Sequence, residues 1–385
     1  MNNRHFDYII IGAGAAGLQL ALRLAKDSFF ADKKVLLLDR SPKNSNDRTW
    51  SFWEAGVGEW DALCWKKWSF AKFKNTDVDL HLDLSPYKYK SLRGLDFYNH
   101  AREVLSGSAQ FTWLQEEVLE VKESGDSVDV KTSSHTYSCS YVFDSRVDAS
   151  FYEVDDAYNR LLQHFKGWVI ETPQPCFNEE SFTMMDFRWK EAGTTSFMYV
   201  LPVSPTKALV EFTYFSPALV EERIYEEKIR AYLKDELKLD SYTVEETEFG
   251  IIPMSDFPFE RGSSPRVIKI GTAGGWVKPS TGYSFKNGGR LSLKIVGNLK
   301  SGLPPESLLF SRKHRWYDRL LVDVLMKQND IGPQLFSQMY RKNKVQQIFR
   351  FLDDETTLLE DIRLIASFSP WPFLKALVRT TFRKH

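Results

Sequence analysis

The sequence is poor in cysteine, has no long apolar run and carries no net charge. Its three cysteines, Cys64, Cys139 and Cys176, form no C-x-x-C pair and no metal-ligand spacing, so we predict reduced thiols, no metal site and a cytoplasmic location. No stretch of about eighteen apolar residues occurs, which argues against a membrane-spanning helix. Residues 1–5 do not open a signal peptide, because the apolar run behind them reads as a strand. The 51 basic residues balance the 51 acidic ones, so the overall charge does not indicate a nucleic-acid partner.

What the sequence has in quantity is length and aromatic side chains. A chain of 385 residues is too long for one compact core and predicts two or three structural units. Aromatic residues make up 14% of the chain, with 11 Trp and 28 Phe. A large core accounts for them, but so many rings also suit a long apolar ligand.

The first forty residues read as a strand, a glycine turn, a helix and a second strand. The apolar run Asp7–Ile11 is typical of a buried parallel strand. It leads into Gly12-Ala13-Gly14-Ala15-Ala16-Gly17, a G-x-G-x-x-G motif, and a helix is predicted over Ala15–Lys26. The second strand, Lys34–Leu38, ends at Asp39. An ordinary glycine turn is the alternative, but the order of these elements favours a dinucleotide-binding unit.

Each glycine of this motif has a predicted role. Gly12 allows the tight turn, Gly14 lets a pyrophosphate approach the backbone, and Gly17 lets the helix pack on the strand. The helix N-terminus would face the phosphates. Asp39 stands where an acid binds the ribose hydroxyls, which favours FAD or NAD over NADP.

The rest of the chain predicts an insertion into this nucleotide-binding unit. Residues 163–253 carry alternating strand patterns and one charged helix, Pro217–Glu236. The chain then returns with a buried strand, Val267–Gly271, a glycine-rich loop and a helix, Gly288–Leu299. We therefore predict an α/β fold: a glutathione-reductase-like FAD-binding Rossmann domain (1–60, 94–160 and 262–303), an inserted antiparallel-sheet substrate domain (61–93 and 161–261), and a helical C-terminal region (304–385).

Several separated stretches carry a resemblance to one family. Besides the glycine motif with its acid, they are Asp47–Trp53, Met185–Phe187, Phe197–Pro202, Leu209–Thr213, Gly250–Met254 and Pro279–Ser284. They run in the family's order over nearly the whole chain. On these residues the sequence resembles the lycopene beta-cyclases of carotenoid synthesis.

The resemblance implies an intramolecular lyase, an isomerase, acting on lycopene and other acyclic or monocyclic carotenoids. It implies bound FAD in its reduced form, NAD(P)H as the reductant, and no net redox change in the substrate. Lycopene would be protonated at a terminal double bond, the cation would close a ring, and loss of a proton would lead through gamma-carotene to beta-carotene. Because the substrate sits in a bilayer, we expect peripheral contact with the inner face of the membrane.

The family motif around Glu211 usually holds two adjacent acids, but here the second position is Phe212. The resemblance therefore assigns Glu211 as the catalytic acid, and a strand would in any case turn the two neighbours to opposite faces. Asp186 is the reserve candidate. Without the resemblance, Glu211 reads as an exposed strand acid.

The cofactor candidates lie in the two glycine-rich regions and directly after the second strand. They are Gly12, Ala13, Gly14, Ala16, Gly17, Asp39, Arg40, Arg48, Gly271, Thr272, Gly282 and Tyr283. Arg48 is available to a phosphate or ring oxygen, although the aromatic segment around it is equally explained by packing. Gly271-Thr272 departs from the Gly-Asp of many flavoproteins, so the ribitol contact there would carry no charge. Trp50, Trp53 and Phe285 are the substrate candidates, whose rings would stabilise a cation.

Other functions remain open at this stage. A flavin-dependent hydroxylase or an isoprenoid-chain reductase would share this architecture, and a non-enzymatic escort protein for prenyl or lipid chains would need no redox-active flavin. The apolar segment Ile365–Leu374 is explained either by a helix docked on the core or by a segment that dips into a membrane interface around Trp371 and Phe373. The oligomeric state is not predicted.

Overall fold

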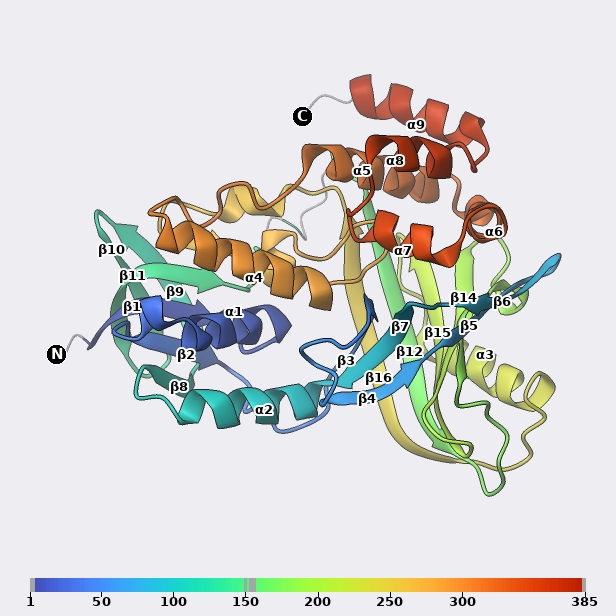
Figure 1. The fold of residues 1–385 in the computed structure, drawn as a ribbon, viewed down its shortest axis with the longest axis horizontal. Coiled ribbons are helices and arrows are strands. Elements are labelled where there is room, and N and C mark those ends of the chain that lie inside the picture. Colours follow the sequence, from blue (N-terminus) through green and yellow to red (C-terminus); the bar gives the residue numbers. More distant parts are fainter. Residues whose placement is uncertain (1–3, 149–150, 152–156, 383–385) are drawn as a thin grey trace.

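The computed structural model describes residues 4–148, 151 and 157–382. Across these residues the chain forms two seven-stranded sheets and one three-stranded sheet. The two large sheets lie at opposite ends of the long axis, and the C-terminal helices lie along one side (Figure 1). The α/β fold class predicted from the sequence is confirmed.

The nucleotide-binding unit is built on the sheet β8-β2-β1-β11-β10-β9, with β17 beside β11. Its strands are β1 (Arg4–Ile11), β2 (Val35–Asp39), β8 (Phe111–Gln115), β9 (Val118–Ser124), β10 (Ser127–Thr132), β11 (Thr136–Asp144) and β17 (Val267–Lys269). The pairs of β1, β2, β8, β11 and β17 are parallel, whereas β9 and β10 pair antiparallel. Apolar side chains alternate to both faces of β1, because each face is covered.

Three helices enclose this sheet. They are α1 (Ala15–Lys26), α2 (Gly94–Ser106) and α4 (Phe285–Lys300). Helix α1 lies beside α4 on one side and contacts α2 on the other (Figure 1). The bounds of α1 are those expected from the glycine motif, whereas α4 begins three residues earlier than expected, at Phe285.

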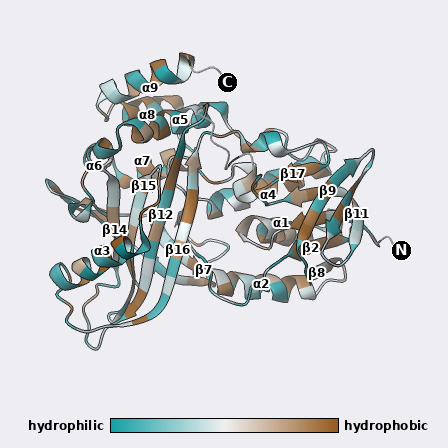
Figure 2. Cartoon of the chain, turned by 180° about the vertical axis from the view of Figure 1, so that it is seen from behind, coloured by the Kyte–Doolittle hydropathy of each residue, from teal (hydrophilic) through white to brown (hydrophobic). Residues whose placement is uncertain are grey.

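The second large sheet has the order β16-β12-β15-β14-β13-β5-β6. Its strands are β5 (Phe70–Asn75), β6 (Val78–Asp83), β12 (Arg160–Glu171), β13 (Ser181–Asp186), β14 (Thr195–Pro202), β15 (Lys207–Ser216) and β16 (Thr243–Ser255). Figure 2 shows hydrophobic stretches along the strands of both large sheets. Most neighbours pair antiparallel, but β13 and β5 pair in parallel.

Strand β15 shows how the two faces of this sheet are used. Val210, Phe212 and Tyr214 pack under α3 (Glu222–Asp235), whereas Leu209 and Phe215 belong to the core on the other face. Alternation therefore separates Glu211 from Phe212, as expected from a period of two.

The three-stranded sheet joins the two units. It consists of β3 (Thr49–Ala55), β7 (Tyr87–Arg93) and β4 (Cys64–Trp68), in that spatial order. Strand β3, which lies before the expected boundary at residue 60, pairs antiparallel with β7 over its whole length, while Phe52 and Trp60 pack in the core of the nucleotide-binding unit.

The C-terminal region is helical, as expected. It comprises α5 (Arg312–Lys327), α6 (Gly332–Lys342), α7 (Val345–Leu352), α8 (Leu358–Ile365) and α9 (Pro370–Phe382). These helices cover the face of the large sheet opposite α3, and residues of α5, α6 and α7 share a core with β13, β14 and β15. The helices and the sheet together enclose a space against the glycine-rich loop that precedes α4.

Candidate functional site

The first glycine loop is shaped to receive a phosphate group. Gly12 has φ +101°, and a Cβ there would lie 1.9 Å from the Ser145 hydroxyl oxygen. A Cβ at Gly17 would lie 2.0 Å from the Gly12 carbonyl oxygen. A Cβ at Gly14 would meet nothing within 4 Å, so the space in front of this residue is open. The first and third glycines close the turn, and the second leaves the backbone accessible to a ligand.

A cavity of about 240 Å³ adjoins this loop. Its polar lining includes Lys43, Arg48 and the glycine-rich loop at Gly271 and Thr272. Trp276 also lines it, and the indole Nε1 of Trp276 is buried without a hydrogen-bond partner in the described part of the chain. Two cations, a helix N-terminus and exposed loop backbone suit the phosphates of a dinucleotide.

Asp39 lies at the rim of the same loop. One carboxylate oxygen accepts a hydrogen bond from the Ala13 amide at 2.7 Å, and the other accepts one from the Ser41 amide at 2.7 Å. Each oxygen keeps further lone-pair capacity for ribose hydroxyls. Arg40, by contrast, is exposed and is not part of the cavity lining in the described residues.

The remaining cofactor and substrate candidates divide between two places. Trp50 lines the nucleotide cavity, and Phe285 stacks on it with ring centroids 5.4 Å apart. Trp53 and Tyr283 line a different cavity, and their rings meet edge to face at 4.7 Å. Gly282, with φ +74°, lies against Gln163 of the large sheet. The structure thus places Tyr283 with the substrate candidate Trp53 instead of with the phosphate-binding loop.

This second cavity measures about 610 Å³ and is mostly apolar. Its floor is formed by Met184, Met185 and Phe215 of the sheet, and one wall by the loop Ser280–Tyr283. Side chains of α5 to α9 form the other walls. A volume in the range of small-molecule sites, with such walls, suits a long hydrocarbon ligand.

Glu211 is buried on the cavity side of the large sheet. It lies on the face of β15 that carries Phe215 to the cavity, and its residue surface is 6% exposed. The Thr213 hydroxyl donates a 2.5 Å hydrogen bond to its Oε1. Burial raises the pKa of Glu211 well above its ordinary value, and the charge of Glu248 adds to the rise. This carboxyl therefore retains its proton under conditions in which a surface glutamate is ionised.

Asp186 lies elsewhere. It is opposite Met198 in the register of β13 and β14, and Met198 packs in the core under α3. Arg188 binds it through Nε at 2.9 Å and through a terminal guanidinium nitrogen at 2.6 Å. The reserve acid is thus a carboxylate paired with arginine on the α3 side, and the structure does not bring it together with Glu211.

A chain of three tyrosines, of which Tyr89 is fully buried, runs from the cavity to the strand beside Glu211. Tyr89 bonds to Tyr199 at 2.7 Å and to Tyr283 at 2.8 Å between hydroxyl oxygens. Tyr199 stands opposite Glu211 on the neighbouring strand. Sequence reasoning missed Tyr89 and Tyr199, although Tyr199 falls inside one of the family-like stretches.

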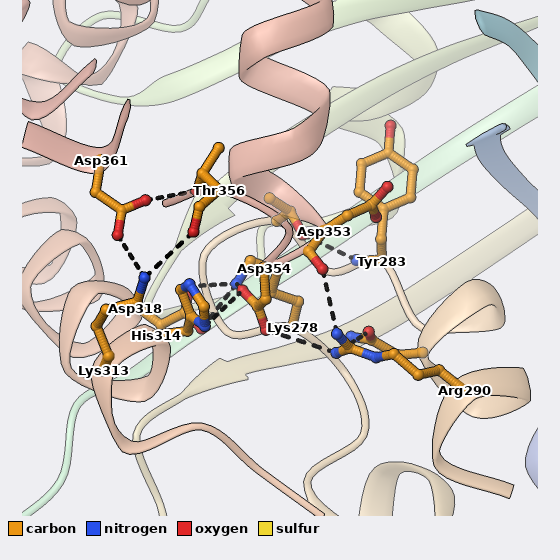
Figure 3. A network of polar contacts seen from close by, with 12 residues as sticks. Lys278, Tyr283, Arg290, Lys313, His314, Asp318, Asp353, Asp354, Thr356 and Asp361 are labelled. Atoms are coloured by element: carbon orange, nitrogen blue, oxygen red, sulfur yellow. Dashed lines mark hydrogen bonds and ion pairs between the residues drawn. The ribbon is translucent and has the colours of Figure 1, made fainter. Parts of the chain in front are cut away.

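Below the cavity, charged residues tie the C-terminal helices to the second glycine-rich loop (Figure 3). The ammonium group of the buried Lys278 contacts Asp318 at 3.1 Å and Asp354 at 2.8 Å. Although burial opposes its charge, these two carboxylates hold the pKa of Lys278 above its ordinary value. The neighbouring Asp353 accepts a 2.7 Å hydrogen bond from Nε1 of Trp53. The cavity wall is therefore fixed by buried ion pairs.

An exposed apolar surface surrounds the cavity on the C-terminal helices. Trp371 is 70% exposed, whereas Phe373 is half-buried and lines the cavity. The other exposed apolar residues of α8 and α9 are Leu358, Leu359, Ile362, Ile365, Leu374, Val378 and Phe382. In the part of the chain that the structure describes, no helix has the length and apolar character to cross a membrane, and no group of three or more His, Cys, Asp or Glu side chains is placed to hold a metal ion.

Comparison with known proteins gives one consistent result. The family model described as lycopene cyclase protein matches residues 7–378. A lycopene beta-cyclase of Pantoea ananas is 24% identical over 98% of this chain and 99% of its own. A chloroplastic lycopene beta cyclase of Solanum lycopersicum is 26% identical over 72% of this chain and 57% of its own.

Solved structures share the fold at lower identity. A geranylgeranyl bacteriochlorophyll reductase-like protein of Thermoplasma acidophilum has a TM-score of 0.59 at 12% identity, covering 98% of this chain and 97% of its own. The halogenase PltM, solved with phloroglucinol and FAD, has a TM-score of 0.56 at 13% identity, covering 97% and 86%.

Proposed function

Because the chain belongs to the lycopene cyclase family, we propose that it is a lycopene beta-cyclase. It converts lycopene through gamma-carotene to beta-carotene by protonation, ring closure and deprotonation, with no net redox change. The observation that carries this proposal is Glu211, a carboxyl buried on the face of β15 that carries Phe215 to a large apolar cavity.

We propose FAD as the resident cofactor. The residues fit it: the glycine loop leaves Gly14 open, Asp39 stands at the ribose position, and Lys43 and Arg48 line the phosphate cavity. Thr272 would offer a neutral hydroxyl to the ribitol. When bound in its reduced form, with NAD(P)H as the source of electrons, FAD supplies negative charge that stabilises a nearby cation.

Glu211 carries the proton chemistry in this proposal. Protonating an unactivated double bond requires an acid that still carries its proton in a dry site, and burial of Glu211 supplies both conditions. The proton moves from the Glu211 carboxyl to the terminal double bond, the tertiary cation closes the ring, and a ring proton returns to the carboxylate. Proton balance is therefore kept within the site, as an isomerisation requires.

Aromatic residues support the cation and exclude water. Trp53 and Tyr283 both line the cavity, and their rings pack edge to face with centroids 4.7 Å apart, so an end group beside this pair would meet an aromatic surface. A desolvated ring face contributes about 1–2 kcal/mol to binding a cation. Trp50 and Phe285, which stack near the nucleotide cavity, would instead pack beside the cofactor.

We further propose that the protein acts in the cytoplasm, attached to the inner face of the membrane. Ile362, Ile365 and Leu374 are exposed and also line the cavity, so the apolar surface of α8 and α9 is continuous with the cavity entrance. A helix surface of this kind inserts into the interface between lipid headgroups and acyl chains. Lycopene would then pass from the bilayer into the cavity without crossing water.

The test is expression in a lycopene-accumulating bacterium, followed by chromatography of the pigments. Beta-carotene, with gamma-carotene as the half-cyclised intermediate, is the expected product. Unchanged lycopene, with the protein present and holding FAD, would contradict the proposal. Consumption of dioxygen with the substrate would then indicate a hydroxylase, and loss of double bonds would indicate a reductase.

A further inference from the structure

A second carboxyl group shares the buried face of Glu211. In the register of the large sheet, Gly167 of β12 stands opposite Glu211 of β15 on one side and opposite Glu248 of β16 on the other. Residues directly opposite each other in antiparallel strands point to the same face. The two glutamates therefore flank a glycine on one face of the sheet.

Gly167 leaves the space between the two acids free of a side chain. A Cβ at this position would lie 3.5 Å from Cβ of Glu211 and 3.2 Å from Cγ of Glu248. Any larger side chain would stand between the carboxyl groups. A Cβ at Gly167 would also lie 3.0 Å from Cδ1 of Leu209, so the glycine leaves room in which this leucine and the two glutamate side chains pack together.

The surroundings of the two acids differ in a way that decides which one is charged. Glu248 accepts a 2.9 Å hydrogen bond from the Thr49 hydroxyl, and the charges of Arg93 and Arg48 stabilise its anion. Burial nevertheless raises the pKa of Glu248 to about 7, with Glu246 adding to the rise.

Around Glu211 the structure places one hydroxyl donor, from Thr213, and the phenols of Tyr199 and Tyr283, but no cation contacts its carboxyl group in the described part of the chain. When two neighbouring carboxyls share one proton, the proton rests on the member whose anion is less stabilised. That member is Glu211.

We propose that Glu248 is the second carboxyl of the proton-donating site: its anion holds the shared proton on Glu211 across the gap left by Gly167. Glu248 acts through Glu211 and is a positioning residue. This inference rests on the proposed cyclase function for its catalytic meaning, but the pairing itself is a property of the protein.

The first test is a titration that does not require activity. Infrared spectra of the full-length protein with its FAD follow the carbonyl band of protonated carboxyls against pH, and Glu211→Gln identifies the band of Glu211. Glu248→Gln keeps the Thr49 hydrogen bond but removes the charge, so the Glu211 band is expected to disappear at a pH lower by about one unit or more. Glu245→Gln, which removes an exposed acid of the same strand paired with Lys207, is expected to leave the band in place.

Gly167→Ala provides a second, independent test should Glu248→Gln fail to fold. It keeps both acids but inserts a methyl group between them, and the Glu211 midpoint is expected to move in the same direction. A midpoint unchanged in both folded variants, or raised in either, would overturn the pairing.

The second measurement is the pH profile of cyclisation. In Glu248→Gln the alkaline limb of the profile is expected to move to lower pH by the same interval as the infrared midpoint. A uniform loss of turnover without a shift of the limb would overturn the positioning role. Failure of the wild-type protein to make any ring would contradict the proposed function alone, because the infrared titration would still decide the pairing.

Discussion

Replacing Glu211 by glutamine removes one proton from the site and changes its shape very little. The side-chain amide oxygen can still accept the hydrogen bond from Thr213. The residue does not line the nucleotide cavity, so we expect the variant to bind FAD as the wild type does. What it cannot do is donate a proton to a double bond.

The expected loss follows from the role of a general acid. Such a group contributes about 10²–10⁴-fold to the rate of an ordinary reaction. In a dry cavity no water molecule can protonate the alkene in place of Glu211, so we expect a rate loss in the upper part of this range. A loss of about 10⁴-fold corresponds to ~5 kcal/mol of transition-state free energy. Initial rates of lycopene consumption by the reduced protein, at equal FAD content, measure it.

Stability gives a check that does not depend on turnover. Burial raises the pKa of Glu211 in the folded protein, so the folded state binds this proton more tightly than the unfolded state does. The wild type therefore loses stability as pH rises from the unfolded pKa of about 4.3 towards the folded one, by at most ~1.4 kcal/mol per pH unit. Glu211→Gln removes this dependence, and its unfolding free energy relative to wild type should grow between pH 5 and pH 8.

Two results would refute this reasoning. One is a folded, FAD-containing Glu211→Gln variant that retains more than about a tenth of the wild-type rate, because loss of a general acid lowers the rate by more than that. The other is a difference in unfolding free energy that is flat with pH, because the carboxyl would then be ionised at the same pH in both states. Glu171→Gln, an exposed acid at the end of β12, is the matched control for both measurements.

Three further predictions concern other parts of the molecule. Gly14→Val is expected to abolish FAD binding with little change in melting temperature, because its side chain enters open space in the cavity; an FAD content equal to wild type would contradict the cofactor assignment. Lys278→Met takes the ammonium group away from the buried Asp318 and leaves Asp354 with Arg290, and should cost about 3–5 kcal/mol of unfolding free energy; a loss below about 1 kcal/mol in urea denaturation would show that water reaches the pair. Trp371→Ser combined with Leu359→Ser should weaken co-sedimentation with anionic liposomes several-fold, whereas Leu219→Ser near α3, also exposed, should not; equal sedimentation of all three proteins would remove α8 and α9 from this role.

The nucleotide-binding unit was readable from the sequence because its signals are local. Strand β1, the glycine turn and α1 follow one another within a few residues, and α1 has the bounds that its pattern predicts. The sheet to which β3 belongs could not be predicted from neighbouring residues in the same way. Its partner β7 is about forty residues away, and only that pairing shows that β3 belongs to the joining sheet.

The site was predictable in part. Glu211 was found through a resemblance that preserves its strand, but the side of the sheet occupied by Asp186 was not readable, because the register of β13 shifts between Thr183 and Asp186. Glu248 gave no signal of its own in the sequence. Glu248 comes near Glu211 only through two strand pairings that meet at Gly167. Both pairings join residues far apart in the sequence. Tyr283 was assigned to the cofactor because the sequence cannot show that its loop turns from one cavity to the other.

That loop has a thermodynamic consequence. Tyr283 lines the apolar cavity, and Ser284, the next residue, lines the nucleotide cavity. A ligand that displaced this segment in one cavity would change the shape of the other, and with it the affinity of the second site. Linkage makes the effect reciprocal. If a bound nucleotide changes the affinity for a hydrocarbon by some factor, the bound hydrocarbon changes the affinity for the nucleotide by the same factor. A membrane rich in the hydrocarbon would thus also retain the protein in its nucleotide-loaded form.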